Sequence, residues 1–327
     1  MDEMKIKTRV VGVDLALDYT TCAVIDIRGT IIAKEAFATS DYPDVNNFIS
    51  VLCEKIVRLS ENNGGIENIR SVGISAPSAN FKTGCVENAS NLSWKGVVPL
   101  AAMLRDRLGL AVAVANDGHV TALGEEAFGT AHGMKDFIVM TFTHGGVGSC
   151  IFIKGRPHLG TNGFAGEIGH TCFVENGRQC GCGRKGCLET YVSIKGIVQN
   201  ARDLMTETDE SSLLRSIDNL DIKAIKLCCQ QNDALAIEAV RRAGSVLGRA
   251  LANYASILNP EAIILTGDLL QVQEWIMPTI RESLEKNVFH NLRGKVRVLP
   301  SILNTEDRTV LGAGALAWDV KEYSLFK

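Results

Sequence analysis

The sequence predicts a duplicated α/β fold, in which each half opens with a strand, a polar turn and a returning strand. The first pair of apolar runs begins near Val10, and the second begins near Phe137. Helical and strand patterns alternate after each pair. The length of 327 residues favours two domains over one small core. We therefore expect two α/β halves with a cleft between them, and ligands beyond the carboxyl ends of the strands.

In the first half, apolar runs separated by turn residues predict strands at 10–15, 21–27 and 31–37. Segment 44–62 carries apolar residues at the 3.6-residue period of an amphipathic helix. Asp44 can cap the start of this helix, and two glycines follow its end. A strand, a helix and a strand are then expected at 71–76, 100–108 and 111–115.

The second half repeats the opening with strands at 137–142 and 149–153 around a glycine turn. A long helix at 233–258 ends where Pro260 cannot continue it. A strand, a helix, a strand and a last helix are expected at 262–266, 272–289, 296–299 and 308–319. We place a small domain at 1–118 and a large one at 119–307, with the last helix, about 308–327, packing back on the small domain.

Composition excludes several classes of protein. The net charge of −3 gives no basic footprint for nucleic acid. No apolar run approaches the ~20 residues of a membrane span, and the polar N-terminus has no secretory pattern. Of the ten cysteines, most of those outside the cluster at 180–187 lie in apolar patterns typical of reduced thiols. We expect a cytoplasmic protein without nucleic-acid or membrane partners.

A cluster of metal-ligand residue types is the strongest local motif. His170, Cys180, Cys182 and Cys187 fall within eighteen residues, with glycines between the thiols. Zn²⁺ favours four nitrogen or sulfur ligands, and a closed site of this kind is structural. The cluster therefore predicts a zinc knuckle, while local disulfides or three buried thiols are the alternatives.

Two glutamates flank this cluster. Folding of the knuckle would bring Glu167 and Glu189 together, and carboxylates accept the hydrogen bonds that carbohydrate hydroxyls donate. His170 could bind the metal with one nitrogen and a ligand with the other, or serve as a metal ligand alone.

Polar residues also follow strand-like runs in the first half. Asn116 and Asp117 follow the strand at 111–115, where Asp117 could be a general base or, with Asn116, a helix cap. Asp14 ends the first strand and could hold a hydrated metal near phosphates, or only open a turn. Asn91, beside Trp94, could contact a sugar or form an ordinary packed turn.

Two glycine turns in the second half lie just past strand-like runs, where ligands bind in such sheets. The turn at 144–148, with Gly146 and Gly148, could present backbone N–H groups to a phosphate. Gly267 opens a comparable turn after the strand at 262–266. An ordinary tight turn is the alternative for both.

Together these motifs resemble the ROK family (repressor, open reading frame, kinase), which includes bacterial hexose and N-acetylhexosamine kinases and sugar-responsive repressors. The resemblance runs from Val11 to Ala317. It is most specific in Gly-Glu-Ile-Gly-His at 166–170 and Cys-Gly-Cys-Gly-x-x-Gly-Cys-x-Glu at 180–189. It implies a two-domain fold of the actin/hexokinase (ribonuclease H-like) type with a structural zinc knuckle. It also implies a homodimer that uses ATP with Mg²⁺.

The resemblance assigns roles residue by residue. Asp117 matches the catalytic base. The positions that match sugar ligands are Asn91, Asn116, Asp117, Glu167, His170 and Glu189. The positions that match the phosphate and nucleotide loops are Asp14, Gly146, Gly148 and Gly267. The positions that match zinc ligands are His170, Cys180, Cys182 and Cys187.

This sequence departs from the family pattern in its nucleotide loops. The family's Asp-x-Gly-Gly-Thr is here Asp14-Leu-Ala-Leu-Asp18, and a carboxylate facing ATP phosphates repels them unless Mg²⁺ bridges the two. Gly-Thr-Gly-x-Gly is here His144-Gly-Gly-Val-Gly148, without the hydroxyl. Of the glycine run after the strand at 262–266, only Gly267 remains.

Two functions follow. The first is an ATP-dependent sugar kinase that phosphorylates a hexose or N-acetylhexosamine hydroxyl, with Asp117 as general base. The second is a non-catalytic sugar-binding sensor of the same family, because the phosphate and adenosine loops are altered. A DNA-binding repressor is not expected, since the first core strand starts near Val10 and leaves no room for a helix-turn-helix module.

Overall fold

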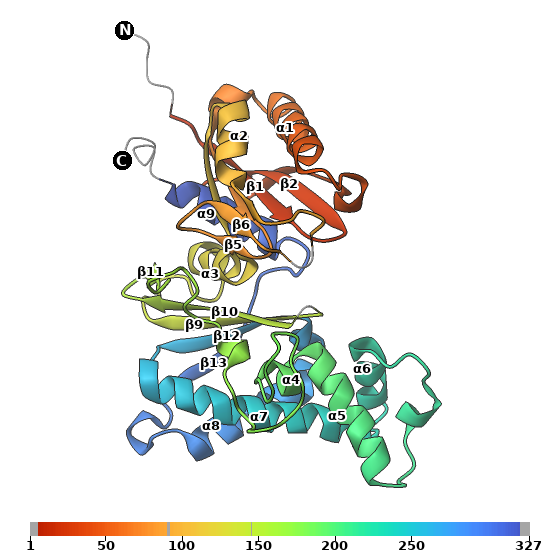
Figure 1. Ribbon diagram of the computed structural model, residues 1–327. Helices are drawn as coiled ribbons and strands as arrows, with labels where there is room; N and C mark the ends of the chain where they lie inside the picture. The colour runs from red at the N-terminus through yellow and green to blue at the C-terminus, as the bar shows by residue number, and fades with distance from the viewer. Residues whose placement is uncertain (1–5, 90–91, 145, 321–327) are drawn as a thin grey trace. The chain divides into compact units, whose positions relative to one another are not determined.

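The computed structural model describes residues 6–89, 92–144 and 146–320, and its contacts divide the chain into two compact units. The first unit contains the chain up to Gly133, the short segment Leu159–Ala165, and the chain from Ile302 onwards. The second unit contains Met134–His158 and Gly166–Ser301. Figure 1 labels the helices and most of the strands of both units.

The first unit is built on a five-stranded sheet of order β3-β2-β1-β4-β8. Three strands form an antiparallel meander: β1 (Arg9–Leu15), β2 (Tyr19–Asp26) and β3 (Ile31–Ala38). The strands β4 (Ile69–Ser75) and β8 (Ala111–Ala115) add to it in parallel. Three short strands form a separate sheet: β5 (Ala79–Asn80), β6 (Cys85–Glu87) and β7 (Val97–Val98).

Helices cover both faces of this sheet. Alternating side chains of β1, such as Val11 and Val13, pack on one face with apolar residues of α1 (Val45–Glu61) and α2 (Leu100–Leu108). Val10 packs on the other face against the helix that ends the described chain. That helix is α9 (Arg308–Asp319), and it lies beside α3 (Asp117–Phe128).

Glycines let α9 approach the sheet. A Cβ atom at Gly12 or at Gly73 would collide with carbonyl oxygens of α9. Gly124 of α3 similarly faces Gly312 of α9, where a Cβ atom would lie 3.0 Å from the Gly312 Cα. These contacts fix the position of α9, which begins at Arg308, relative to β1, β4 and α3.

The second unit repeats the strand order of the first. Its sheet has the order β11-β10-β9-β12-β13, again a three-stranded antiparallel meander extended by two parallel strands. The meander comprises β9 (Phe137–Thr143), β10 (Gly146–Ile153) and β11 (Arg156–Pro157). The parallel strands are β12 (Ala262–Gly267) and β13 (Arg297–Pro300). The duplicated order predicted from sequence is therefore confirmed.

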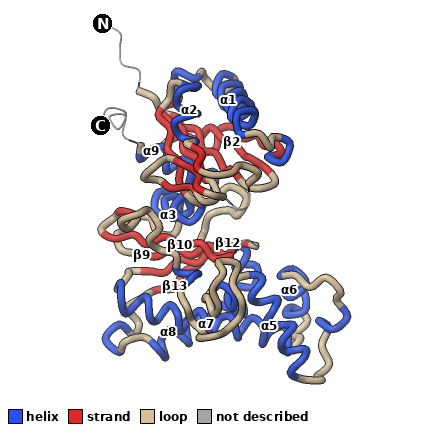
Figure 2. The backbone as a smooth tube through the Cα atoms, in the orientation of Figure 1, coloured by secondary structure: helices blue, strands red, loops and turns tan. Residues whose placement is uncertain are grey.

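The helices of the second unit pack into one large apolar cluster with β9 and β12. Their bounds are α4 (Glu189–Val192), α5 (Ile194–Glu207), α6 (Ile222–Gln230), α7 (Ala234–Leu258) and α8 (Gln273–Asn287). The long α7 and α8 lie side by side, and Figure 2 shows the helical layer against the strands. Two 3₁₀ turns contain or adjoin predicted site residues: η3 (Ile168–His170) contains His170, and η5 (Asp268–Val272) directly follows Gly267 at the end of β12.

No helix among the described residues is long and apolar enough to cross a membrane.

Candidate functional site

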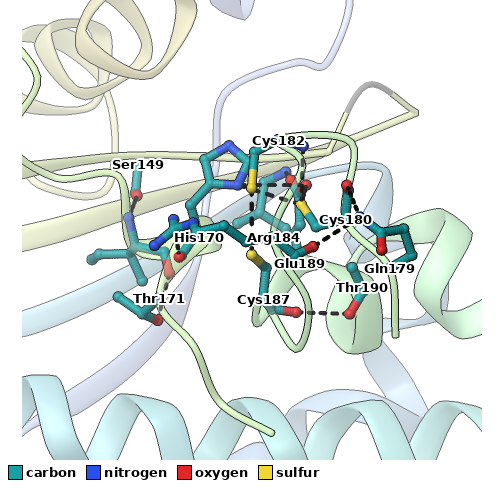
Figure 3. A network of polar contacts seen from close by, with 12 residues as sticks. Ser149, His170, Thr171, Gln179, Cys180, Cys182, Arg184, Cys187, Glu189 and Thr190 are labelled. Carbon is teal, nitrogen blue, oxygen red and sulfur yellow. Dashed lines mark hydrogen bonds and ion pairs between the residues drawn. The ribbon is translucent and has the colours of Figure 1, made fainter. Parts of the chain in front are cut away.

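The predicted metal ligands converge in the second unit. The ligand atoms of His170, Cys180, Cys182 and Cys187 all lie within 4.8 Å of one another (Figure 3). The Cys180 Sγ atom lies 3.7 Å from His170 Nδ1, and the sulfur atoms of Cys182 and Cys187 are 3.6 Å apart. With Zn–S bonds of about 2.3 Å, a tetrahedral site has edges of about 3.8 Å. The donor set and its spacing fit zinc, and all ten cysteines are free thiols in the structure.

A short hairpin holds the thiols. The Cys180 N–H donates to Arg184 O at 2.8 Å, and Gly183 N–H donates back to Cys180 O at 3.1 Å. Gly183 and Gly186 have φ angles of 89° and 77°, a region that glycine adopts without strain. The Arg184 guanidinium donates to His170 O at 2.6 Å and so ties the hairpin to η3. The sequence Cys-Gly-Cys-Gly-x-x-Gly-Cys thus folds locally around the ligand atoms.

The thiols of this cluster differ in acidity. Hydrogen bonds from the Arg184 backbone and side chain lower the pKa of the Cys182 thiol to about 6. Desolvation, together with the nearby Glu189 carboxylate, raises the pKa of Cys180. A thiolate is the form that binds metal, so the cluster offers one at neutral pH through Cys182.

Glu189 lies between the knuckle and the glycine hairpin of β9 and β10. Its Oε1 atom lies 3.0 Å from Cys180 Sγ and 3.6 Å from His170 Nδ1. Its Oε2 atom accepts a hydrogen bond from Val147 N–H at 3.5 Å. A Cβ atom at Gly146 would lie 2.6 Å from Oε2, so a side chain at this position would displace the Glu189 carboxylate. The predicted sugar ligand Glu189 and the predicted phosphate-loop residue Gly146 are therefore neighbours.

The turn that carries Glu167 and His170 is fixed on β10. The Ser149 hydroxyl donates to Gly166 O and accepts from Ile168 N–H at 3.3 Å. Glu167 is exposed, and His170 is partly buried with Nδ1 on the thiol side. His170 Nε2 is the nitrogen that remains for a second partner.

A cavity of about 530 Å³ adjoins these groups in the second unit. Its lining includes Gly146 and Glu189, with Ser193 and Lys195 from the start of α5. Lys195 is exposed and brings a positive charge to this cavity, which the motifs did not predict. A larger cavity of about 710 Å³ along α5, α7 and α8 contains none of the sequence-predicted residues.

In the first unit, the sheet brings Asp14 and Asp117 to one edge. Asp14 of β1 is in register with Ser75 of β4, and Ser75 is in register with Ala115 of β8. These strands are parallel, so their carboxyl ends share an edge, and Asp117 lies two residues beyond Ala115. Asn116 caps α3 by accepting from His119 N–H at 2.8 Å. Asn116 is therefore the N-cap of α3, and this role uses only its Oδ1 atom.

Arg308 and Thr309 join this edge from the far end of the chain. Desolvation and the neighbouring Asp117 charge raise the pKa of Asp14 to about 6, while Arg308 and a hydrogen bond from Thr309 oppose the rise. Desolvation of the carboxyl group also raises the pKa of Asp117, and the Arg308 charge again opposes the rise. The Asp117 residue as a whole is exposed. Arg308 is 6% exposed. Sequence motifs gave no signal for it, because 294 positions separate it from Asp14.

The altered loops adopt tight turns. Ala16 N–H donates to Tyr19 O at 3.2 Å, which closes the β1–β2 turn and leaves Leu17 and Asp18 exposed. Gly267 has a φ angle of 91° and lies against Phe142 O, where a Cβ atom would not fit.

The other loop residues lie in β10 and near η5. Gly148 is a regular residue of β10 paired with Thr141. His144 Nδ1 lies 3.9 Å from an Asp268 carboxylate oxygen, linking the two glycine turns. Gly145 and the predicted sugar contact Asn91 lie outside the described residues.

Comparisons with known proteins agree with this architecture. The family model described as ROK family matches residues 10–320. A glucokinase of Halalkalibacterium halodurans is 32% identical, over 95% of this chain and 94% of that protein. A xylose repressor of Bacillus spizizenii is 27% identical, over 90% of this chain and 73% of the repressor.

A solved structure extends the likeness to three dimensions. The crystal structure of a ROK family glucokinase from Streptomyces griseus, in complex with glucose and AMPPNP, aligns with a TM-score of 0.77 and 29% identity. The alignment covers 95% of this chain and 100% of that one. The predicted α/β fold of the actin/hexokinase type is thus confirmed.

Proposed function

Because this chain belongs to the ROK family, we propose that it is a sugar kinase that transfers the γ-phosphate of ATP to a hydroxyl of a hexose or N-acetylhexosamine. The observation that carries the proposal is the end-to-end similarity to a protein named glucokinase. The glucokinase from Streptomyces griseus was crystallised with glucose and an ATP analogue, which supports the same pair of ligands here.

The sugar is held by carboxylates and an imidazole in this proposal. Glu167 and Glu189 accept hydrogen bonds from sugar hydroxyls, and His170 offers Nε2 while Nδ1 faces the thiols. Asn116 contributes its side-chain amide, because its Oδ1 atom is already used by the helix cap. Asn91 is the remaining proposed contact.

Asp117 is the proposed general base. It takes the proton of the sugar hydroxyl as that oxygen attacks the γ-phosphate in line. The raised pKa of Asp117 suits this role, since a base with a pKa nearer the working pH accepts a proton more readily in the transition state. Phosphoryl transfer then depends mainly on positioning and charge neutralisation.

The phosphates are held by backbone donors and by Mg²⁺ in this proposal. Gly146 and Gly267 have φ angles of 143° and 91°, a backbone conformation in which N–H groups can face an anion. Gly148, a regular residue of β10, is the remaining proposed contact. Asp14 is the residue that would hold a hydrated Mg²⁺ ion, whose charge relieves the repulsion between Asp14 and Asp117. Lys195, beside Gly146 in the same cavity, adds positive charge.

Zinc has a structural role in the proposal. Four protein ligands would leave no open position for chemistry, so His170 and the three cysteines hold the hairpin and thereby orient Glu189. A cytoplasmic homodimer remains our prediction for the assembled protein.

A second candidate is a sugar-binding sensor without catalysis. It is favoured by the β1–β2 turn, where Ala16 and Leu17 replace the two glycines of the family pattern and Asp18 replaces its threonine. It is also favoured by Arg308, which already places a permanent cation beside Asp14. Relatives named xylose repressor show that the family includes proteins that are not named as kinases.

Ligand-induced stabilisation combined with turnover tests the proposal. A ligand at 100 times its Kd stabilises the native state by about 2.7 kcal/mol. A kinase responds to a hexose or N-acetylhexosamine, responds separately to Mg·AMPPNP, and releases ADP when sugar and ATP are combined. Stabilisation by sugar alone, with no ADP released, would replace the kinase by the sensor.

A further inference from the structure

Cys172 is an exposed thiol beside the zinc-ligand cluster, and the proposed function does not use it. It is not among the four residues whose ligand atoms converge. Its Sγ atom lies 3.9 Å from Lys185 O, and a Cβ atom at Gly186 would lie 3.5 Å from it. The thiol therefore lies along the backbone that leads directly into Cys187.

The backbone pairs Cys172 with Cys187. The two residues form an isolated antiparallel bridge. On one side of the pair, Phe173 N–H donates to Gly186 O at 2.8 Å. On the other side, Leu188 N–H donates to Thr171 O at 3.0 Å. Because these bonds flank the pair, it is of the non-hydrogen-bonded type, whose Cα atoms lie about 4.5 Å apart with both side chains on one face. Disulfides form at Cα separations of about 4.4–6.8 Å.

We propose that Cys172 and Cys187 form a disulfide bond when the protein meets a peroxide, and that this bond withdraws Cys187 from the zinc site. The zinc-releasing part rests on the zinc site of the proposed function, whereas the disulfide itself rests only on the backbone register. Of the two cysteines in this pair, Cys172 is exposed and Cys187 is buried, so the oxidant reaches Cys172 before Cys187. Cys182 is also exposed, but it is held by zinc in the proposed function.

The chemistry balances with hydrogen peroxide as the oxidant. The Cys172 thiol takes one oxygen atom from the peroxide to become a sulfenic acid, and one water molecule leaves. The Cys187 sulfur then attacks the Cys172 sulfur and displaces hydroxide, which takes up a proton to form a second water molecule. Two sulfur atoms have each given up one electron, and both oxygen atoms of the peroxide have become water.

The bond would disturb the ligand site through one residue. Without Cys187, three ligands remain, and the hairpin that holds Cys180 against Glu189 at 3.0 Å loses its anchor. A thiol reductant with added zinc would reverse the change, because the disulfide joins only residues within this segment.

The test is to titrate reduced protein with hydrogen peroxide while a chromogenic chelator reports zinc release, and then to map disulfides by peptide mass spectrometry. We expect loss of two thiols per chain, a peptide that links Cys172 to Cys187, and release of zinc in parallel. Cys172→Ser should retain zinc before oxidation and release it several-fold more slowly. Cys85→Ser, which removes a partly exposed thiol of the first unit, should behave as the parent.

Two results would overturn the inference. One is equal zinc release from Cys172→Ser and the parent. The other is a dominant link between Cys182 and Cys187, whose sulfur atoms are only 3.6 Å apart. If the reduced protein contained no zinc, the zinc site of the proposed function would be wrong. The peptide map would still show whether Cys172 and Cys187 form a disulfide.

Discussion

The two units share one strand order but assemble their polar residues in different ways. In the second unit, the ligand atoms come from a segment of about twenty residues, folded by glycines and backbone hydrogen bonds. In the first unit, Asp14, Asp117 and Arg308 come from three distant parts of the chain and meet because β1, β4 and β8 are parallel and α9 packs on them. A site formed by one continuous segment can be predicted from a sequence motif, whereas a site assembled by a sheet can be identified only from the folded structure.

Removal of a proposed zinc ligand tests the local site and should have the largest effect. Cys180→Ser takes away a ligand and also the contact with Glu189 Oε1. Structural zinc sites carry apparent binding free energies of about 10 kcal/mol or more in zinc-finger peptides, so we expect zinc loss and a clear fall in thermal stability. Metal analysis and calorimetry of Cys180→Ser beside Cys85→Ser measure this. Unchanged zinc content in Cys180→Ser would contradict the metal site.

Neutralising Asp117 tests the assembled site. Asp117→Asn should lower kcat by about 10²–10⁴-fold, the typical contribution of a general base, while sugar binding is retained. ADP release measures kcat, and thermal stabilisation by sugar measures binding. Asp106→Asn, an exposed carboxylate of α2 paired with Arg105, is the matched control. Full activity in Asp117→Asn would end its assignment as the base.

A side chain at Gly146 should damage the second unit through Glu189. Gly146 has a φ angle of 143°, and a Cβ atom would lie 2.6 Å from Glu189 Oε2. We expect a destabilisation of about 1–3 kcal/mol and weaker sugar binding in Gly146→Ala. Gly155→Ala is the matched control, since Gly155 also has a positive φ of 73° but no heavy atom within 4 Å. Equal denaturation curves for the two variants would show that the contact with Glu189 has no cost.

Charge in the first unit predicts a smaller, pH-dependent effect. The pKa of Asp14 is about 6 in the folded protein, compared with 3.8 for an aspartate in the unfolded chain. The folded state therefore binds this proton more tightly. The stability that this proton contributes is complete below pH 3.8 and is lost as the pH rises through about 6. At pH 8, Asp14→Asn should therefore be more stable than the parent by about 1–2 kcal/mol and unfold at a higher temperature, whereas near pH 4 the two should unfold at similar temperatures.

Melting curves of Asp14→Asn between pH 4 and pH 8 measure this difference. Asp18→Asn, on the exposed β1–β2 turn, is the control and should follow the parent at every pH. A gain that is independent of pH would show that the Asp14 charge is not its origin.

Much of the fold could be predicted because its elements have local signals. The 3.6-residue period predicted a helix over 44–62, and α1 occupies Val45–Glu61, with the Asp44 side chain accepting from Asn47 N–H at 2.9 Å. Asn259 and Pro260 predicted the end of the long helix, and Asn259 adopts a left-handed conformation after α7. The helix cap that Asn116 and Asp117 could form is present in α3, which begins at Asp117 with Asn116 as its cap. The helices α5 and α6 were not predicted, although Ser193 and Asp221 cap their starts.

By itself, the sequence determined the knuckle, since its ligands, its glycines and its flanking glutamates lie in one continuous segment whose backbone closes on itself. Only the tertiary structure decided that Glu189 touches Gly146 and that Arg308 and Thr309 lie beside Asp14. The physical reason is that strand register and helix packing bring together residues whose separation along the chain leaves no pattern. Periodicity records which face of an element is apolar, but not which distant side chain that face will meet.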